Sequence, residues 1–96
     1  MKILSYNIHR CSQEKIDYVL SRGADIMVLP ECACPEQVTL PDGYAMTWQG
    51  DDATKWKGLG VIWKRTIRCR VADWYDDSHK YMIPLIIEDK WLLLAA

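Results

Sequence analysis

Two apolar strand candidates flank a capped helix in the N-terminal third of the chain, and this order constrains the fold more than any other feature. Residues 2–7 predict a first strand, and Ile26-Met27-Val28-Leu29 is a continuous apolar run, which is typical of a strand covered on both faces. A strand, a helix and a strand within about thirty residues predict a right-handed crossover with parallel strands.

The helix between these strands has start and stop signals. Ser12 can cap its N-terminus, and Glu14 places a negative charge in the first turn, where it suits the helix dipole. Arg22-Gly23 supplies a cation and a glycine at the other end. The apolar stripe consists of Ile16, Val19 and Leu20. We therefore expect a helix of about ten residues.

Strand patterns dominate the remaining chain. Pro30, Pro35, Pro41 and Asp42-Gly43 predict a loop, with one short helical turn over 35–38. The expected strands are 44–49, 57–64, 67–72, 80–87 and 91–96, with a hairpin turn over 88–90. The predicted fold class is α/β (α+β), with one mostly β sheet, a β-α-β start and a flanking helix.

Length and charge limit the class of protein. The chain has 96 residues and a net charge of −1, so it forms one domain at most and carries no global basic field. It lacks a signal-peptide pattern, and its apolar runs are too short to span a bilayer. We expect a cytoplasmic location, and free thiols at four irregularly spaced cysteines.

The sequence stops inside an apolar strand pattern, Lys-Trp-Leu-Leu-Leu-Ala-Ala. Open apolar edges invite aggregation. We expect residues 1–96 to be a single partial domain, the N-terminal part of a longer protein. The alternative is a last strand tucked into the sheet.

Polar side chains follow the first two strands, where parallel strands end at one rim. Asn7 and Glu31 stand at these ends, and ligands of α/β units gather there. A carboxylate beside an amide oxygen suits a hard cation such as Mg²⁺ or Ca²⁺. The alternative is an ordinary loop asparagine and a solvated glutamate.

Three segments resemble the endonuclease/exonuclease/phosphatase superfamily, which includes deoxyribonuclease-like nucleases and phosphatases. Ser5-Tyr6-Asn7-Ile8 is similar to the end of that family's first strand. Asp25 to Glu31 is similar to the end of its second strand, with Pro30 in place of the usual Gln, and "KGLGVIWK" is similar to a later strand. The resemblance implies the N-terminal half of a four-layer α/β sandwich.

The same resemblance implies a metal-dependent phosphoesterase or phosphodiesterase, a hydrolase that uses Mg²⁺ or Mn²⁺. Glu31 would be the metal carboxylate, and Asn7 would touch the metal or the scissile phosphate. His9 occupies a position where some relatives carry Asp and others His, which makes it a weak candidate for phosphate contact. The family's Asp-x-Asn and Asp-His motifs are absent from the sequence, so we expect no turnover by this half alone.

Six cations and no acid lie between Thr54 and Ala72. They could line a nucleic-acid groove with Trp56 and Trp63, but strand residues alternate faces, so a solvated edge is the simpler interpretation. Lys55 and Lys57 are the best candidates for phosphate contact. The cysteines could instead bind zinc, although Cys32-x-Cys34 lacks a matching second pair.

A second functional hypothesis remains open. The chain could be a non-catalytic binding or interaction module that self-associates through an exposed sheet, forming a homo-oligomer if it ends at Ala96. The first hypothesis requires a phosphoester substrate, nucleic acid among the candidates.

Overall fold

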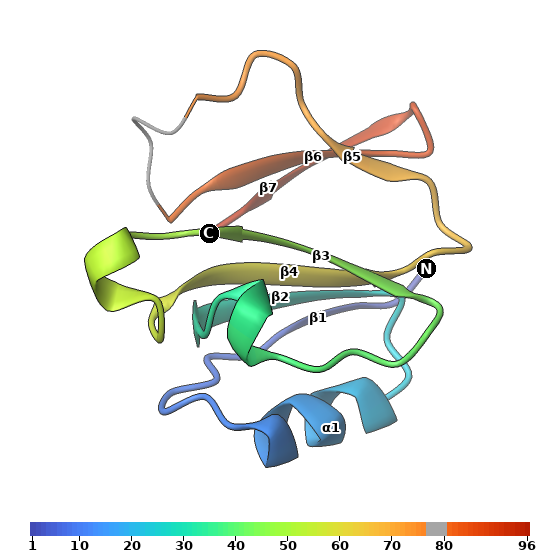
Figure 1. Ribbon diagram of the computed structural model, residues 1–96. Coiled ribbons are helices and arrows are strands. Elements are labelled where there is room, and N and C mark those ends of the chain that lie inside the picture. The colour runs from blue at the N-terminus through green and yellow to red at the C-terminus, as the bar shows by residue number, and fades with distance from the viewer. Residues whose placement is uncertain (77–80) are drawn as a thin grey trace.

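A computed structural model describes residues 1–76 and 81–96, which form two β-sheets and one α-helix (Figure 1). The α+β class is therefore confirmed. No helix in these two ranges has the length and apolar character needed to cross a membrane. The elements are β1 (Ile3–Ser5), α1 (Gln13–Ser21), β2 (Ile26–Cys32), η1 (Pro35–Gln37), β3 (Tyr44–Gln49), η2 (Asp52–Thr54), β4 (Gly58–Lys64), β5 (Cys69–Val71), β6 (Ile83–Ile87) and β7 (Trp91–Ala95).

The β-α-β start is present as predicted. Strands β1 and β2 pair in parallel, with Ile3 opposite Ile26. The Ser12 hydroxyl accepts a hydrogen bond from the Lys15 N–H at 3.3 Å, which caps α1. Arg22 ends the helix, and Gly23 follows with a φ of 73°, the left-handed conformation that glycine adopts readily after a helix.

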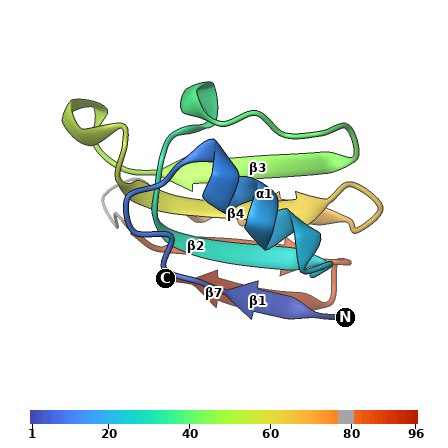
Figure 2. The same ribbon diagram turned by 90° about the horizontal axis from the view of Figure 1, so that it is seen from below.

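The first sheet has the order β1-β2-β4-β3. Strand β4 lies antiparallel to both β2 and β3. Helix α1 crosses one face of this sheet (Figure 2). The core between them contains Ile8, Ile16, Val19, Ala24, Met27, Leu29, Cys32 and Ile62. The helix stripe and alternate residues of β2 thus form one apolar layer.

The second sheet has the order β5-β6-β7, which corrects the expectation of a single sheet. It packs on the opposite face of the first sheet. The core between the two sheets contains Ile26, Val28, Leu59, Val61, Ile83, Leu85, Ile87 and Ala95. Because consecutive residues of β2 enter different cores, its continuous apolar run is explained by burial on both faces.

Several strand boundaries differ from the predictions. Strand β1 ends at Ser5 rather than at residue 7, β5 covers only Cys69–Val71, and β6 begins at Ile83. Lys80, the predicted first residue of that strand, lies outside the described residues. The hairpin turn over 88–90 is present. Glu88 and Asp89 have φ values of 55° and 54°, as in the turns that match the twist of paired strands.

Candidate functional site

Asn7 is held beside β2 by the backbone on either side of it. The Tyr6 N–H donates to the Val28 carbonyl at 3.0 Å, and the Ile8 N–H donates to the Pro30 carbonyl at 3.1 Å. The Ile8 side chain is fully buried. The parallel pairing therefore continues beyond β1 and carries the exposed Asn7 side chain to the end of β2. The Asn7 Oδ1 accepts the His9 N–H at 3.0 Å, which fixes the amide orientation.

Glu31 lies in a β-bulge of the central strand β2. Leu29 pairs with Gly60 and Cys32 pairs with Gly58, so β2 has one more residue than β4 between these pairs. Glu31 has a φ of 60°, a left-handed conformation that is uncommon for a residue with a side chain. Bulges occur next to functional sites because they change the direction of a side chain. Here the bulge directs Glu31 to the rim where Asn7 lies.

The sequence predicted a loop from Pro30 and did not predict this bulge. Strand β2 continues through Pro30 and Glu31 to Cys32. A proline inside a central strand is found at bulges because it cannot donate to the ladder. Pro30, which follows the apolar run, was thus the one sequence signal for the bulge, because a proline at this position is compatible with either a bulge or a loop.

Two glycines of β4 allow Trp48 and Cys32 to pack against the bulge. A Cβ on Gly58 would lie 2.4 Å from Trp48 Cζ2, and one on Gly60 would lie 2.9 Å from Cys32 Sγ. The Trp48 Nε1–H donates to the Cys32 carbonyl at 2.9 Å. The Gly-Leu-Gly sequence is therefore required by close packing behind the site, which sequence reasoning did not identify.

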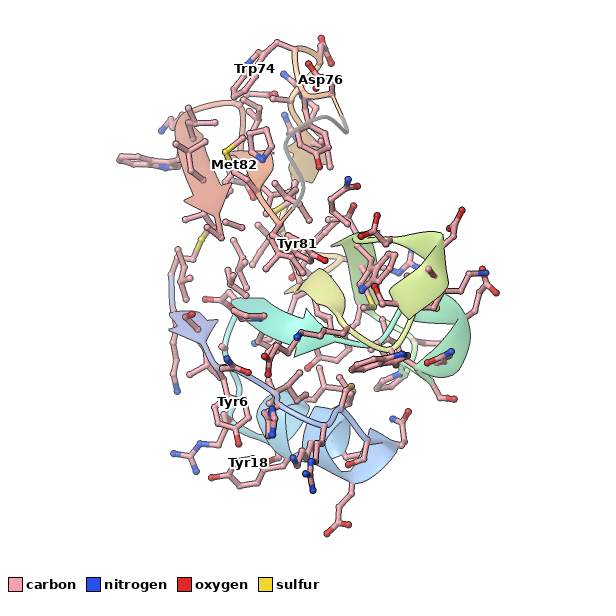
Figure 3. All side chains as sticks on the ribbon, turned by 90° about the vertical axis from the view of Figure 1, so that its left-hand side faces the viewer. Tyr6, Tyr18, Trp74, Asp76, Tyr81 and Met82 are labelled. Atoms are coloured by element: carbon pink, nitrogen blue, oxygen red, sulfur yellow. The ribbon has the colours of Figure 1, made fainter. Side chains whose placement is uncertain are left out.

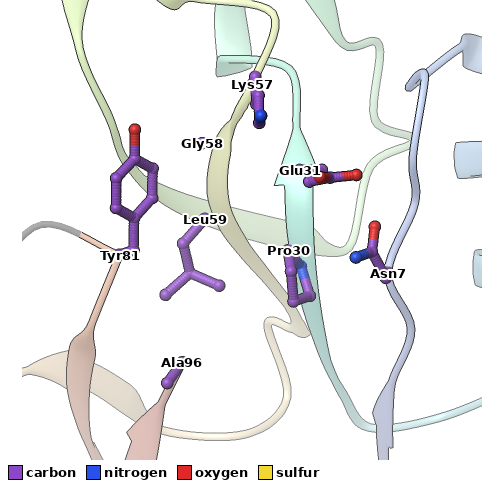
Figure 4. Close-up of a pocket in the computed structure, with 8 residues that line it drawn as sticks. All are labelled: Asn7, Pro30, Glu31, Lys57, Gly58, Leu59, Tyr81 and Ala96. Atoms are coloured by element: carbon purple, nitrogen blue, oxygen red, sulfur yellow. The ribbon is translucent and has the colours of Figure 1, made fainter.

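A hollow of about 420 Å³ opens at this rim (Figure 4). It is lined by Asn7, Pro30, Glu31, Lys57, Gly58, Leu59, Tyr81 and Ala96. Asn7 and Glu31 come from the two parallel strand ends, and Lys57 comes from the residue before β4. Tyr81, which lies two residues before β6, lines the hollow from the side of the second sheet (Figure 3). The hollow thus combines an amide, a carboxylate and an ammonium group.

His9 contacts the other side of Glu31. Its Nδ1 lies 2.9 Å from Glu31 Oε2, and its side chain is 71% exposed. The Lys15 ammonium donates to the His9 carbonyl, which ties this loop to α1. A second hollow of about 280 Å³ is lined by His9, Arg10, Glu31, Trp56 and Lys57. Glu31 and Lys57 therefore line both hollows.

Of the six cations between Thr54 and Ala72, most contact groups outside the two hollows. Lys64 pairs with Asp25 at 3.4 Å, while Arg68 and Arg70 pair with Asp89. Arg65 donates to the Tyr44 carbonyl at 2.9 Å. Lys55 does not line either hollow, and its carbonyl accepts the Cys34 N–H. Across residues 1–76 and 81–96, no carboxylate forms an ion pair with Lys57, which remains available for an anion.

The oxygen donors fit a Mg²⁺ or Mn²⁺ ion only in part. Each carboxylate and amide oxygen has two lone pairs, so Asn7 Oδ1 and both oxygens of Glu31 retain free ones beside His9. Mg²⁺ commonly takes one or two carboxylates and completes its shell with water and phosphate oxygens. No group of three or more His, Cys, Asp or Glu residues suited to a metal occurs in the described part of the chain.

Within residues 1–76 and 81–96, the cysteines form no zinc site with four ligands. Cys32 contacts Cys11. Burial is the main cause that raises the pKa of the Cys32 thiol, and the contact with Cys11 raises it further. Cys69 belongs to β5 and packs against the other core, where burial raises its pKa. All four cysteines are free. Raised pKa values keep the Cys32 and Cys69 thiols protonated, which disfavours metal binding and nucleophilic chemistry.

Comparison with known proteins gives no assignment: no family model, curated protein or solved structure matches this chain.

Proposed function

We propose that the chain carries one side of a metal-dependent phosphoesterase or phosphodiesterase site of the endonuclease/exonuclease/phosphatase type. The observation that carries this proposal is the β2 bulge, which holds Glu31 at a φ of 60° in one hollow with Asn7 and Lys57. Strained backbone at the rim of an α/β unit is typical of a functional position.

Each side chain has a distinct role in this proposal. Glu31 and Asn7 would hold Mg²⁺ or Mn²⁺ through their side-chain oxygens. Such an ion acts as a Lewis acid on the phosphoester when bound. Lys57 contacts an oxygen of the substrate phosphate. The exposed His9 contacts Glu31 through Nδ1, which leaves Nε2 free to meet the substrate.

Binding of Mn²⁺ tests the proposal without requiring turnover. In the presence of inorganic phosphate, we expect the Glu31→Gln variant to bind Mn²⁺ about tenfold more weakly, because it loses the one carboxylate of the site. Glu36→Gln is the matched control, since Glu36 is an exposed glutamate of η1. Equal Mn²⁺ affinity in the wild type and Glu31→Gln would contradict the proposal.

A second candidate function is self-association without catalysis. It is favoured by β7, an edge strand of the second sheet that contains no charged residue. Trp91, Leu92 and Leu94 are 64%, 55% and 56% exposed, although apolar side chains of this size are usually covered. Leu92 and Leu94 form the outer face of β7, because Leu93 and Ala95, which alternate with them, belong to the core between the two sheets.

A further inference from the structure

Trp56 is a large aromatic side chain that projects beside the candidate site with 61% of its surface exposed. The backbone around it is fixed on both sides. The Cys34 N–H donates to the Lys55 carbonyl at 2.7 Å, and the Lys57 N–H donates to the Thr54 carbonyl at 3.0 Å. The tryptophan is therefore presented on a hydrogen-bonded turn, which reduces the ordering cost of binding a flat ligand.

We propose that Trp56 is a stacking platform for a nucleobase, so that the substrate is a single-stranded nucleic acid or a nucleotide. The inference rests on the proposed function, because the phosphate of the same ligand occupies the Glu31 site. Tryptophan stacks on any base through its ring face. The hollow of about 280 Å³ beside Trp56 has room for one planar base.

Continuity between the two hollows supports this ligand. Glu31 and Lys57 line the 420 Å³ hollow and the 280 Å³ hollow alike. A phosphate bound by Lys57 in the first hollow therefore lies next to the second, where Trp56 is exposed. Arg10 lines the second hollow as well, and an arginine there can contact the neighbouring phosphate of a nucleic-acid strand.

An anionic lipid surface fits the same residues less well. A lipid headgroup can place its phosphate at Lys57, but it brings no planar ring to lie against the exposed Trp56. A nucleotide instead places one phosphate at Lys57 and one neutral aromatic ring beside Trp56.

The test compares a fluorescent single-stranded oligodeoxynucleotide with an abasic deoxyribose-phosphate oligomer of equal length. In anisotropy titrations at low salt with Mn²⁺, we expect the wild type to bind the base-containing oligomer more tightly. Trp56→Ala should weaken that binding about tenfold and leave the abasic oligomer unchanged. Trp56→Phe should retain most of the affinity. Trp74→Ala is the matched control, since Trp74 is 60% exposed on another part of the chain.

The outcomes separate this inference from the proposed function. Equal binding of the two oligomers by the wild type, or no binding of either, overturns the stacking role. The Mn²⁺ titration of Glu31→Gln, which needs no base, then still decides whether the phosphoester site exists. A Trp56→Ala variant that loses affinity for anionic phospholipid vesicles but not for the oligonucleotide also overturns the inference, in favour of a lipid surface.

Discussion

The left-handed backbone of Glu31 couples stability to function at a single residue. A φ of 60° costs a residue with a Cβ about 1 kcal/mol, and glycine avoids this cost. We therefore expect Glu31→Gly to be more stable than Glu31→Ala by about 1 kcal/mol, although both lose the carboxylate. Urea unfolding of the two variants measures the difference. A Glu31→Ala variant at least as stable as Glu31→Gly would show that the bulge is not strained.

Asp25 provides a residue-scale prediction of pH dependence. The Lys2 N–H donates to its Oδ2 at 2.8 Å, and this bond, assisted by Lys64, lowers the pKa of Asp25. A lowered folded-state pKa stabilises the protein above the unfolded value of about 3.9, and the contribution disappears as the pH falls through the folded value. We expect the stability difference between the wild type and Asp25→Asn to shrink as the pH falls from about 5 through the unfolded value and below it.

Urea midpoints across this pH range are the measurement. Asp42→Asn is the control, because Asp42 is exposed and forms no hydrogen bond or ion pair within residues 1–76 and 81–96. The difference in stability between Asp42→Asn and the wild type should not change with pH. An Asp25→Asn difference that is equally constant would rule out a native-state role for the Lys2 and Lys64 contacts.

At the scale of elements, the packing of Trp48 against β4 predicts a strong effect of a small substitution. A Cβ at Gly58 would lie 2.5 Å from Trp48 Cε2 and 2.7 Å from the Gln49 carbonyl. Gly58→Ala should therefore lower the free energy of unfolding by about 1–3 kcal/mol, as overpacking does. The double variant with Trp48→Leu should lose less unfolding free energy than the sum of the losses in the two single variants, because the Trp48 ring is the main group that the added Cβ meets.

Chemical denaturation of the wild type, the two single variants and the double variant measures the coupling between Trp48 and Gly58. Gly23→Ala is a useful comparison, since nothing lies within 4 Å of the Cβ position there and only the positive φ opposes it. Additive costs for Trp48→Leu and Gly58→Ala would contradict the packing argument.

The sequence predicted those elements whose structure is determined by residues close together in the chain. Ser12 and Gly23 mark the ends of α1, and the parallel strand ends bring Asn7 and Glu31 into one hollow. The bulge at Glu31 was missed because it depends on the register between β2 and β4. Registers and distant packing, such as Trp48 over Gly58, are set by segments far apart in the sequence.

At the scale of the whole molecule, β1 at the edge of the first sheet and β7 at the edge of the second sheet run close together (Figure 2). A third hollow of about 490 Å³ between them is lined by Met1, Ile3, Ile87, Trp91, Leu92 and Leu93. The other edge of the second sheet, β5, carries Arg70 and is short, and both features discourage strand addition. Strand β7 has neither protection.

Strand β7 is therefore expected to pair with β7 of a second copy. An antiparallel pair centred on Leu93 is self-complementary, because Leu92 of each copy lies opposite Leu94 of the other. Sedimentation velocity should show an association that increases with protein concentration. Leu92→Lys combined with Leu94→Lys should abolish it, since like charges would face each other across the pair. Tyr18→Lys is the control, because Tyr18 is 59% exposed on α1. A wild type that stays monomeric at every concentration, or a double variant that associates equally well, would exclude β7 as the contact.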